Sequence, residues 1–310
     1  EQTLQSTRDG FGLGLLRAAQ LHSNVVGVCA DLTESTRMQW FSQQFPERFF
    51  QVGVAEQNLI GVAAGLAMGG LVPFAASYAC FSPANSWGVI RTSVCYKANV
   101  KIVGGHAGVV TGEDGATHQS LEDIALMSVL PGMTVVVPAD GEEARKATLA
   151  LAQLIGPAYL RTSKCTVAPI TDHDSPFVIG EANVLHPGAD VSIIACGTLV
   201  GEALAAARLL EPKGIAVRVI NMHTIKPLDE TTVRAAASET KHVFTLEDHQ
   251  IHGGLGSAVA EVLASMPQHA PLTRLGMQDT FGASGTAQEL LSAYHLTSED
   301  LVSKISALGA

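Results

Sequence analysis

Short apolar runs alternate with longer segments of helical pattern along the whole chain. The short runs predict buried strands, and the longer periodic segments predict helices. In the first half, the pattern predicts strands at residues 25–30, 49–54, 71–76, 100–103, 134–138 and 158–162, and helices at residues 8–20, 56–68, 84–96 and 141–155. This alternation of strand and helix is typical of a parallel sheet that is covered by helices.

A second α/β unit follows a change of character after Cys165. Polar turns at residues 171–176 and 186–188 indicate a linker with a small hairpin. Beyond it, the pattern predicts strands at residues 191–195, 216–221, 242–246 and 272–275, helices at residues 201–210, 230–237 and 254–265, and two terminal helices. The sequence therefore predicts an α/β fold with two parallel-sheet, three-layer domains, at residues 1–165 and 189–310, joined by a linker at residues 166–188.

Composition narrows the class of protein. Of the 310 residues, 47% are apolar and 15% are charged, which allows two large cores, and the net charge of -10 argues against a nucleic-acid surface. No uninterrupted apolar run reaches membrane-spanning length, and residues 1–8 lack the apolar run of a signal peptide. The five cysteines show no C-x-x-C spacing, so we expect thiols in a reducing compartment and a cytoplasmic chain.

Glu56 is the only charged residue between Arg48 and Arg91. It stands between a short apolar run and a long helix rich in Ala, Gly, Leu and Ile. Because burial disfavours the charged form of a carboxylate, we expect Glu56 to be buried, with a hydrogen-bonding partner or a raised pKa. A favourable interaction with the helix dipole would be the simpler interpretation for an arbitrary glutamate at this position.

Other polar and aromatic side chains follow the predicted strands. Ligands of parallel α/β sheets bind beyond the carboxyl ends of the strands, so Asp31 and Ser35 are candidate site residues. A turn aspartate and a helix-capping serine would look the same. Tyr78 and Phe81 follow the third strand and are candidate site residues for the same reason, although ordinary core aromatics would give the same pattern. Lys164 follows the sixth strand, where it could bind an anion or be a solvated surface residue.

The histidine loop (residues 104–119) is the segment richest in chemistry. It holds five glycines, two histidines and two acids between a predicted strand and a predicted helix. A polar loop of this length in a compact domain is seldom only a connector. Its glycines let the backbone approach a ligand, and His106 and His118 can donate or transfer protons near neutral pH. No third ligand has a spacing that matches the two histidines, so we predict no metal site in this chain.

Three motifs together resemble the transketolase family. They are Gly53-Val54-Ala55-Glu56-Gln57-Asn58, Gly112-Glu113-Asp114-Gly115-Ala116-Thr117-His118-Gln119 and Thr224-Ile225-Lys226-Pro227-Leu228-Asp229. Residues 8–164 look like the family's pyrimidine-binding domain, and the second half looks like its C-terminal domain. The resemblance thus covers essentially the whole chain, and three such motifs at the right separations do not coincide by chance.

The resemblance also implies a partner. Transketolases bind the diphosphate of thiamine diphosphate through a divalent metal in an N-terminal domain marked by Gly-Asp-Gly and a later Asn, and this chain has no such motif. The chain thus resembles one subunit of a split transketolase, active only with a separate subunit that holds the diphosphate and Mg²⁺ or another divalent cation. Active sites of the family lie between protomers, which implies an α2β2 heterotetramer with this chain as its homodimer core.

The resemblance assigns four residues to the cofactor. Glu56 matches the catalytic glutamate that hydrogen-bonds N1′ of the aminopyrimidine, which promotes removal of the thiazolium C2 proton. Tyr78 matches a phenylalanine that stacks on the pyrimidine, and Phe81 matches a second aromatic residue of the same pocket. Asp31 matches an acid near the cofactor.

The resemblance implies that the substrate is a ketose or ketose phosphate that gives a two-carbon ketol unit to an aldose or aldose phosphate, as in pentose phosphate metabolism. The residues that the resemblance assigns to the substrate are Arg8, Ser35, His106, Asp114, His118 and Lys164. Among them, His118 and His106 match catalytic histidines, the first close to the thiazolium. Many relatives have Arg at position 164, and Lys offers a point charge in place of a bidentate fork.

Two other interpretations stay open. A different thiamine-diphosphate enzyme, such as a deoxyxylulose-phosphate synthase-like enzyme or the beta subunit of a 2-oxo-acid dehydrogenase, would share Glu56 and the sheet. The polar segment at residues 112–119 favours transketolase, because sugar hydroxyls need several polar partners. A non-catalytic α/β binding subunit is the alternative from another class, and Glu56 with its aromatic and histidine companions argues against it. The sequence leaves open which sugars are used and whether they are phosphorylated.

Overall fold

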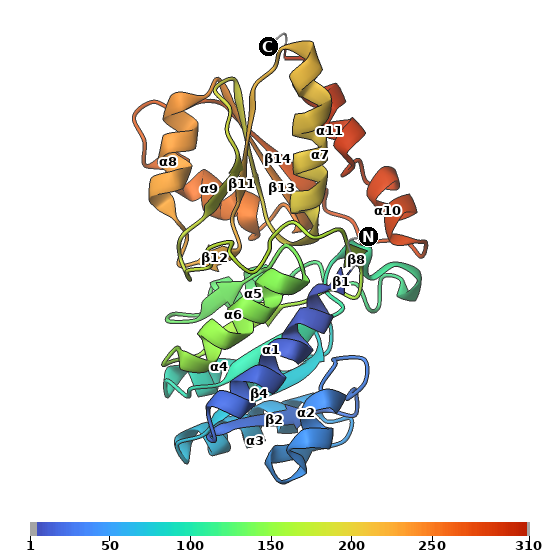
Figure 1. Cartoon of the computed structure of the whole chain (residues 1–310), viewed down its shortest axis with the longest axis vertical. Coiled ribbons are helices and arrows are strands. Elements are labelled where there is room, and N and C mark those ends of the chain that lie inside the picture. The colour runs from blue at the N-terminus through green and yellow to red at the C-terminus, as the bar shows by residue number, and fades with distance from the viewer. Residues whose placement is uncertain (1–4, 309–310) are drawn as a thin grey trace.

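The computed structural model describes residues 5–308, which form two α/β domains, one above the other in Figure 1. The first domain is built on a seven-stranded sheet with the order β12-β6-β7-β5-β4-β2-β3. Its strands are β2 (Val25–Cys29), β3 (Phe49–Gln51), β4 (Val72–Tyr78), β5 (Lys101–Gly105), β6 (Thr134–Val136), β7 (Ala158–Arg161) and β12 (Thr224–Lys226). All its strand pairs are parallel apart from β12 with β6.

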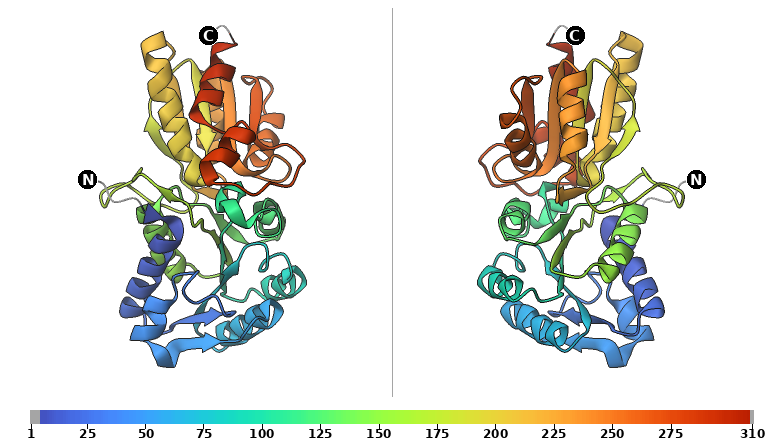
Figure 2. Two further views of the ribbon diagram at one scale, coloured as in Figure 1. Left: turned by 90° about the vertical axis from the view of Figure 1, so that its right-hand side faces the viewer. Right: turned by 90° about the vertical axis from the view of Figure 1, so that its left-hand side faces the viewer.

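Two layers of helices enclose the first sheet, as the side views in Figure 2 show. The helices are α1 (Thr7–Leu21), α2 (Gln39–Gln44), α3 (Glu56–Met68), α4 (Trp87–Cys95), α5 (Asp123–Ser128) and α6 (Gly141–Gln153). On one face, Phe11 of α1 and Leu151 of α6 belong to the same buried cluster. On the other face, Leu59 of α3 and Ile90 of α4 belong to a second cluster. Central strands buried on both faces need near-continuous apolar runs, which is the pattern that the sequence shows.

The second domain is built on a five-stranded sheet with the order β14-β13-β10-β11-β9. Its strands are β9 (Asn183–His186), β10 (Val191–Ala195), β11 (Val217–Asn221), β13 (His242–Gln250) and β14 (Leu272–Met277), and its helices are α7 (Val200–Leu210), α8 (Glu230–Glu239), α9 (Leu255–Ala264), α10 (Ala287–Ala293) and α11 (Ser298–Ser306). Helix α7 packs against α11, and α8 packs against α9. The predicted pair of three-layer α/β domains is confirmed. Across residues 5–308, no helix is both long and apolar enough to cross a membrane.

The chain crosses between the two domains more than once. β1 (Gln5–Ser6) and β8 (Thr166–Val167) form a small antiparallel sheet, and β9 lies in the second sheet. The predicted linker at residues 166–188 therefore contributes a strand near each of its ends. β12 belongs to the second half of the chain but pairs with β6 at the edge of the first sheet. The sequence pattern does not predict β12, because Thr224–Lys226 has a single apolar residue between two polar ones and no apolar run.

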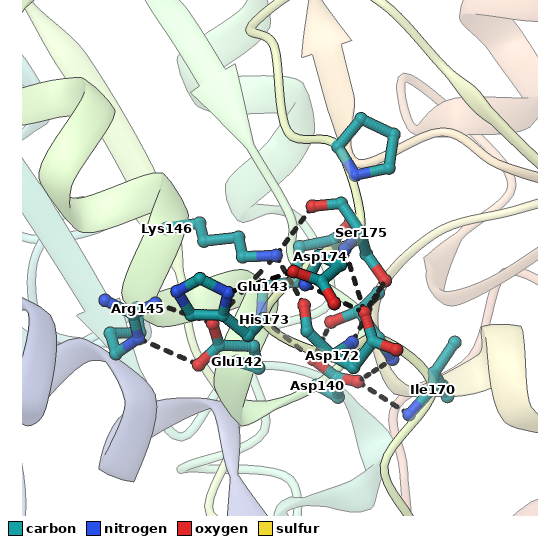
Figure 3. A network of polar contacts seen from close by, with 12 residues as sticks. Asp140, Glu142, Glu143, Arg145, Lys146, Ile170, Asp172, His173, Asp174 and Ser175 are labelled. Atoms are coloured by element: carbon teal, nitrogen blue, oxygen red, sulfur yellow. Dashed lines mark hydrogen bonds and ion pairs between the residues drawn. The ribbon is translucent and has the colours of Figure 1, made fainter.

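The polar turn at residues 172–175 lies against α6, as Figure 3 shows. Asp172 Oδ1 accepts a hydrogen bond from the backbone N–H of Ser175 (2.8 Å), and Lys146 Nζ donates to the carbonyl oxygens of both residues. Asp140, which precedes α6, accepts from the backbone N–H of Ile170 (2.6 Å). These acids are satisfied by local donors. Among the residues that the structure describes, no group of three or more His, Cys, Asp or Glu side chains is placed to hold a metal ion.

A buried ion cluster joins the two domains. Arg161 Nε at the end of β7 donates to Asp123 Oδ2 (2.8 Å), and Arg161 Nη1 donates to Asp248 Oδ1 on β13. The hydroxyl of Tyr159 also donates to Asp123 Oδ2 (2.7 Å). Arg161 is 5% exposed, and Asp123 and Asp248 are 0% and 2% exposed. One guanidinium thus compensates two buried carboxylates, one from each domain.

Arg161→Met should lower the free energy of unfolding by about 3–5 kcal/mol, because two buried carboxylates would lose their counter-charge. Urea denaturation at pH 7 measures this loss. Arg234→Met is the matched control, since Arg234 forms an ion pair with Glu230 (3.0 Å) in which both side chains are well exposed. The control should lose less than about 1 kcal/mol. Equal losses in the two variants would contradict the assignment.

Candidate active site

The side chains singled out from the sequence gather at one edge of the first sheet. Asp31 follows β2, Glu56 comes after β3, Tyr78 ends β4, His106 follows β5 and Lys164 comes after β7. Because these strands are parallel, their carboxyl ends share one edge, where ligands bind in sheets of this kind. Asp31 and His106 have φ angles of 59° and 54°. Such left-handed backbone is sparsely populated outside glycine and is often found at functional sites.

Arg8, Ser35 and His106 come from three separate segments and meet at this edge. Arg8 Nη1 donates to the carbonyl oxygen of Ser35 (3.2 Å) and lies 3.4 Å from His106 Nε2. The neighbouring acid, Asp9, is bound by Arg37 Nε at 2.6 Å. Arg8 Nε is buried and has no hydrogen-bond partner among the described residues. The hydrogen-bonding capacity of the guanidinium is therefore not filled by acceptors among the described residues.

His106 is a neutral histidine held between Arg8 and an aromatic ring. It is 4% exposed, and its ring stacks on Tyr78 with 3.8 Å between the ring centroids. Burial, together with the positive charges of Arg8 and Lys164, lowers the pKa of His106 from 6.5 to about 3. Its Nδ1 is buried without a protein partner in the part of the chain that the structure describes. His106 is therefore suited to exchanging hydrogen bonds with a polar ligand as an uncharged ring.

Tyr78, Phe81 and His118 form a half-buried aromatic group beside His106. The rings of Tyr78 and Phe81 are nearly parallel, with an interplanar angle of 11° and 5.6 Å between centroids. The ring of His118 meets that of Phe81 edge-on, at 5.3 Å and 74°. The hydroxyl of Thr117 lies 2.9 Å from His118 Nδ1 and fixes the orientation of that imidazole. Together these rings offer flat apolar faces next to a titratable histidine.

Lys164 is paired with the acids of the histidine loop. Its Nζ donates to Asp114 Oδ2 (2.8 Å) and lies 3.6 Å from Glu113 Oε2. The hydrogen bond from Lys164 is the main reason why the pKa of Asp114 is lowered. An anionic ligand at this point would have to share Lys164 with Asp114. The structure thus brings the predicted substrate residues together, while their roles remain predictions.

Glu56 is only half buried, which corrects the expectation of a carboxylate sheathed by apolar residues. It is the first residue of α3, and the preceding Val54 is 78% exposed. The apolar neighbours are therefore divided: Leu59 and Ile60 are buried in the core, Val54 is exposed, and the carboxylate is not fully enclosed. Gln57 Nε2 donates to the carbonyl oxygen of Asn85 (3.2 Å), which ties the start of α3 to the segment after Tyr78.

The arrangement around Glu56 fits a flat heterocycle. Burial, and to a smaller extent nearby carboxylates including Glu56, raises the pKa of the Cys80 thiol to about 12. Cys80 is one of the two residues between Tyr78 and Phe81. A half-exposed acceptor beside half-exposed parallel rings can hold an aromatic ring by one hydrogen bond and by stacking. These residues fit the aminopyrimidine of thiamine diphosphate.

Two residues of this region are missed by the sequence analysis. Gln119 is 3% exposed, and its Nε2 donates to the carbonyl oxygens of Gly112 (3.0 Å) and Ala283 (2.9 Å). Asp248 reaches the histidine loop at Gly108, where an added Cβ would lie 1.7 Å from its Oδ2. Both contacts join segments that are far apart in the chain, so no local pattern reveals them. The one available signal is that Gln119 ends the motif that begins at Gly112.

His106 should remain neutral from pH 5 to pH 8, because its lowered pKa of about 3 lies below this range. Nitrogen-15 NMR of histidine-labelled protein should show neutral-imidazole shifts for His106 throughout the titration. His106→Gln identifies the signal. In the unfolded state, His106 has its ordinary pKa of 6.5 and takes up a proton below that pH, while the folded state does not. The free energy of unfolding should therefore fall as the pH is lowered from 6.5 towards 3. An imidazolium signal for His106 at pH 6 would contradict this assignment.

The comparisons with known proteins divide the chain in the same way. The family model described as "Transketolase, pyrimidine binding domain" matches residues 4–169, and "Transketolase, C-terminal domain" matches residues 180–301. A chain of Methanocaldococcus jannaschii, described as a transketolase C-terminal section, is 44% identical over 301 residues, covering 96% of this chain and 94% of that one. A 6-deoxy-6-sulfo-D-fructose transketolase subunit of Clostridium sp. is 40% identical over 296 residues, covering 95% and 92%.

A solved structure agrees with these relatives. It is described as a split gene transketolase in an inactive beta4 tetramer, and it matches with a TM-score of 0.91, 43% identity and 98% of each chain covered. The one-piece transketolase of Rattus norvegicus is 34% identical over 307 residues, which are 98% of this chain but 49% of the rat chain. The resemblance found in the sequence is confirmed: the chain belongs to the transketolase family and, like its split relatives, carries the pyrimidine-binding and C-terminal domains of that enzyme.

Proposed function

We propose that the chain works with a separate subunit as a thiamine-diphosphate-dependent transketolase. The reaction moves a two-carbon ketol unit from a ketose or ketose phosphate to an aldose or aldose phosphate. The observation that supports this best is the shared edge at which Glu56, the Tyr78–Phe81 ring pair and the two histidines of the histidine loop gather. Membership of the family supports the class of reaction, and the roles of the residues are our proposal.

Glu56, Tyr78 and Phe81 would hold the aminopyrimidine ring. When bound, thiamine diphosphate supplies a carbon centre that stabilises negative charge, which no side chain offers. The Glu56 carboxyl group would share a proton with N1′ of the ring. Tyr78 and Phe81 would offer stacking faces and exclude water from one side of it. Asp31, exposed at the end of β2, would complete the cofactor site.

His106, His118 and Asp114 would bind the hydroxyl groups of the sugar. His106 has an unpartnered Nδ1 and a lowered pKa, so it would exchange hydrogen bonds without carrying charge. The ring of His118 is fixed through Nδ1 by the hydroxyl of Thr117, so Nε2 is the atom that would exchange a proton with the substrate. The ionised Asp114 would accept from a hydroxyl group.

Arg8, Ser35 and Lys164 would bind a terminal phosphate. Arg8 brings an unsatisfied Nε, and Lys164 brings a second cation at the end of another strand. Charge-assisted hydrogen bonds from two cations are the usual way in which proteins hold a phosphate. Lys164 already donates a hydrogen bond to Asp114. Its contribution to phosphate binding therefore depends on how its ammonium group is shared between Asp114 and the phosphate.

Exposed apolar side chains at the ends of α3 and α4 are consistent with association with further subunits. Val54 is 78% exposed, Met68 at the end of α3 is 75% exposed and Tyr96 after α4 is 73% exposed. Burying these side chains against another subunit would remove apolar area from water and so favour association. We propose that this chain forms the homodimer core of an α2β2 heterotetramer in which the partner binds the diphosphate and Mg²⁺. The inactivity of the related beta4 tetramer agrees with this requirement.

The five free cysteines agree with a cytoplasmic location.

Glu56→Gln should lower the transketolase activity of the reconstituted complex by about 100-fold or more, because the amide cannot share a proton with N1′. The complex is assayed with ketose donors, aldehyde acceptors, thiamine diphosphate and Mg²⁺. Glu47→Gln is the matched control at a side chain that is 69% exposed away from the site. Unchanged activity of Glu56→Gln would remove Glu56 from its role. Full activity of the isolated wild-type chain would refute the need for a partner.

Lys164→Ala should raise KM for a phosphorylated aldose by about tenfold, because one charge-assisted hydrogen bond to the phosphate is lost. KM for the unphosphorylated aldose should change little. Steady-state kinetics of the complex with both acceptors measure the difference. Lys241→Ala, at an exposed ion pair in the second domain, is the control. Equal changes for the two acceptors would show that Lys164 acts through Asp114 and not on phosphate.

A further inference from the structure

The second sheet has no room for a ligand at the place where such sheets usually bind one. From β10 the chain continues to β11 on one side and then to β13 on the other, so the order reverses between β10 and β13. Ligands of open α/β sheets bind at this point, beyond the carboxyl ends of the strands. Here Arg161 of the first domain reaches Asp248 of β13, and the cavity beside them measures about 10 Å³. A space this small holds at most one water molecule.

The second domain instead packs against the histidine loop. Val109 and Val110 of the loop are 0% and 2% exposed and belong to the hydrophobic cluster of the second domain, together with Leu290 of α10. An added Cβ at Gly112 would lie 3.2 Å from the carbonyl oxygen of Gly285. The middle of the loop is therefore part of the core between the domains, although both of its histidines belong to the first domain's site.

Gln119 holds the end of the histidine loop in place through two hydrogen bonds. Its Nε2 donates to Gly112, which closes the loop on itself, and to Ala283, which binds it to the second domain. Gly282 allows this approach, because an added Cβ would lie 1.9 Å from Gln119 Oε1. Gln119 directly follows His118, so its position sets where the backbone of His118 lies.

The segment that receives Gln119 is itself held in place. Gln250 at the end of β13 accepts from the backbone N–H of Asp279 (3.0 Å) and donates to the carbonyl oxygen of Thr280 (2.8 Å). The hydroxyl of Tyr294 accepts from the backbone N–H of Ala283 (2.8 Å). The carbonyl oxygen that binds Gln119 thus belongs to a segment tied to a strand and to the residue after α10.

We propose that the second domain acts as a rigid support for the histidine loop and that Gln119 is a positioning residue of the reaction. A loop with five glycines has a high conformational entropy and would not hold two histidines in place by itself. Catalytic groups must stay within fractions of an ångström of their productive positions. This proposal rests on the proposed function in one respect, which is that the histidine loop binds the sugar.

Hydrogen exchange tests the support without any assay of activity. In the isolated chain, Gln119→Leu should increase amide exchange in residues 106–119 by about tenfold or more, because the carbonyl oxygens of Gly112 and Ala283 lose the donor that ties them together. Gln288→Leu, at an exposed glutamine on α10, is the matched control and should leave the loop unchanged. Unchanged exchange in Gln119→Leu would overturn the proposal, whatever the activity of the complex.

Kinetics of the reconstituted complex test the positioning role. Gln119→Leu should lower kcat by about tenfold or more while the affinity for thiamine diphosphate changes little, because Glu56 and the ring pair lie outside the loop. Gly282→Ala should have the same effect from the opposite side of the contact. The variant that carries both Gln119→Leu and Gly282→Ala should have a kcat no lower than that of Gln119→Leu alone, because both changes act on one contact.

The outcomes separate the two hypotheses. Faster exchange in the loop with unchanged kcat would overturn Gln119 as a positioning residue. A loss of cofactor affinity equal to the loss of kcat would show general damage and would also overturn it. A wild-type complex without transketolase activity would contradict the proposed function, and the exchange experiment would still decide whether the second domain supports the loop.

Discussion

The charge balance around Arg161 is the constraint on which the rest of the structure depends. Asp123 begins the helix after the histidine loop, Asp248 lies on the central part of the second sheet, and both carboxylates are buried. Ions in such surroundings are tolerated only when an opposite charge is held close by. Arg161 can serve both acids only if the domains keep one relative position. That position places α10 and the segment before it beside the histidine loop.

Much of the fold follows from local pattern because its central strands are buried on both faces. Runs such as Val25–Cys29 and Val191–Ala195 have no polar side to expose, so short apolar runs identify them well. The pattern fails where burial is supplied by a distant segment. β13 continues to Gln250 through the polar residues Glu247, Asp248 and His249, which are buried because the start of α9 covers Glu247 and the first domain contacts Asp248 and His249. Local polarity alone indicates that this strand ends earlier.

The candidate site shows the same contrast between residues that a local pattern identifies and residues that a distant segment places. Residues that follow a strand, such as Asp31, Tyr78 and Lys164, could be selected from the sequence because the carboxyl ends of parallel strands share one edge. The predicted full burial of Glu56 is wrong because Glu56 is the first residue of α3 and follows the exposed Val54, whereas Leu59 and Ile60 of the same helix are buried in the core. Gln119 was missed because an amide side chain carries no charge, and its partner at Ala283 is a backbone carbonyl 164 positions away.

The edge strand β12 has a consequence for how the protein is made. Residues 224–226 complete the first sheet, yet they are synthesised after the whole first domain and after β10 and β11 of the second. Until they leave the ribosome, β6 presents an open row of backbone donors and acceptors, which is a template for wrong pairing. The nascent first domain is therefore vulnerable for the time needed to translate about sixty further residues, on the order of several seconds. A chaperone that shields β6 during this interval would favour the correct closure of the sheet.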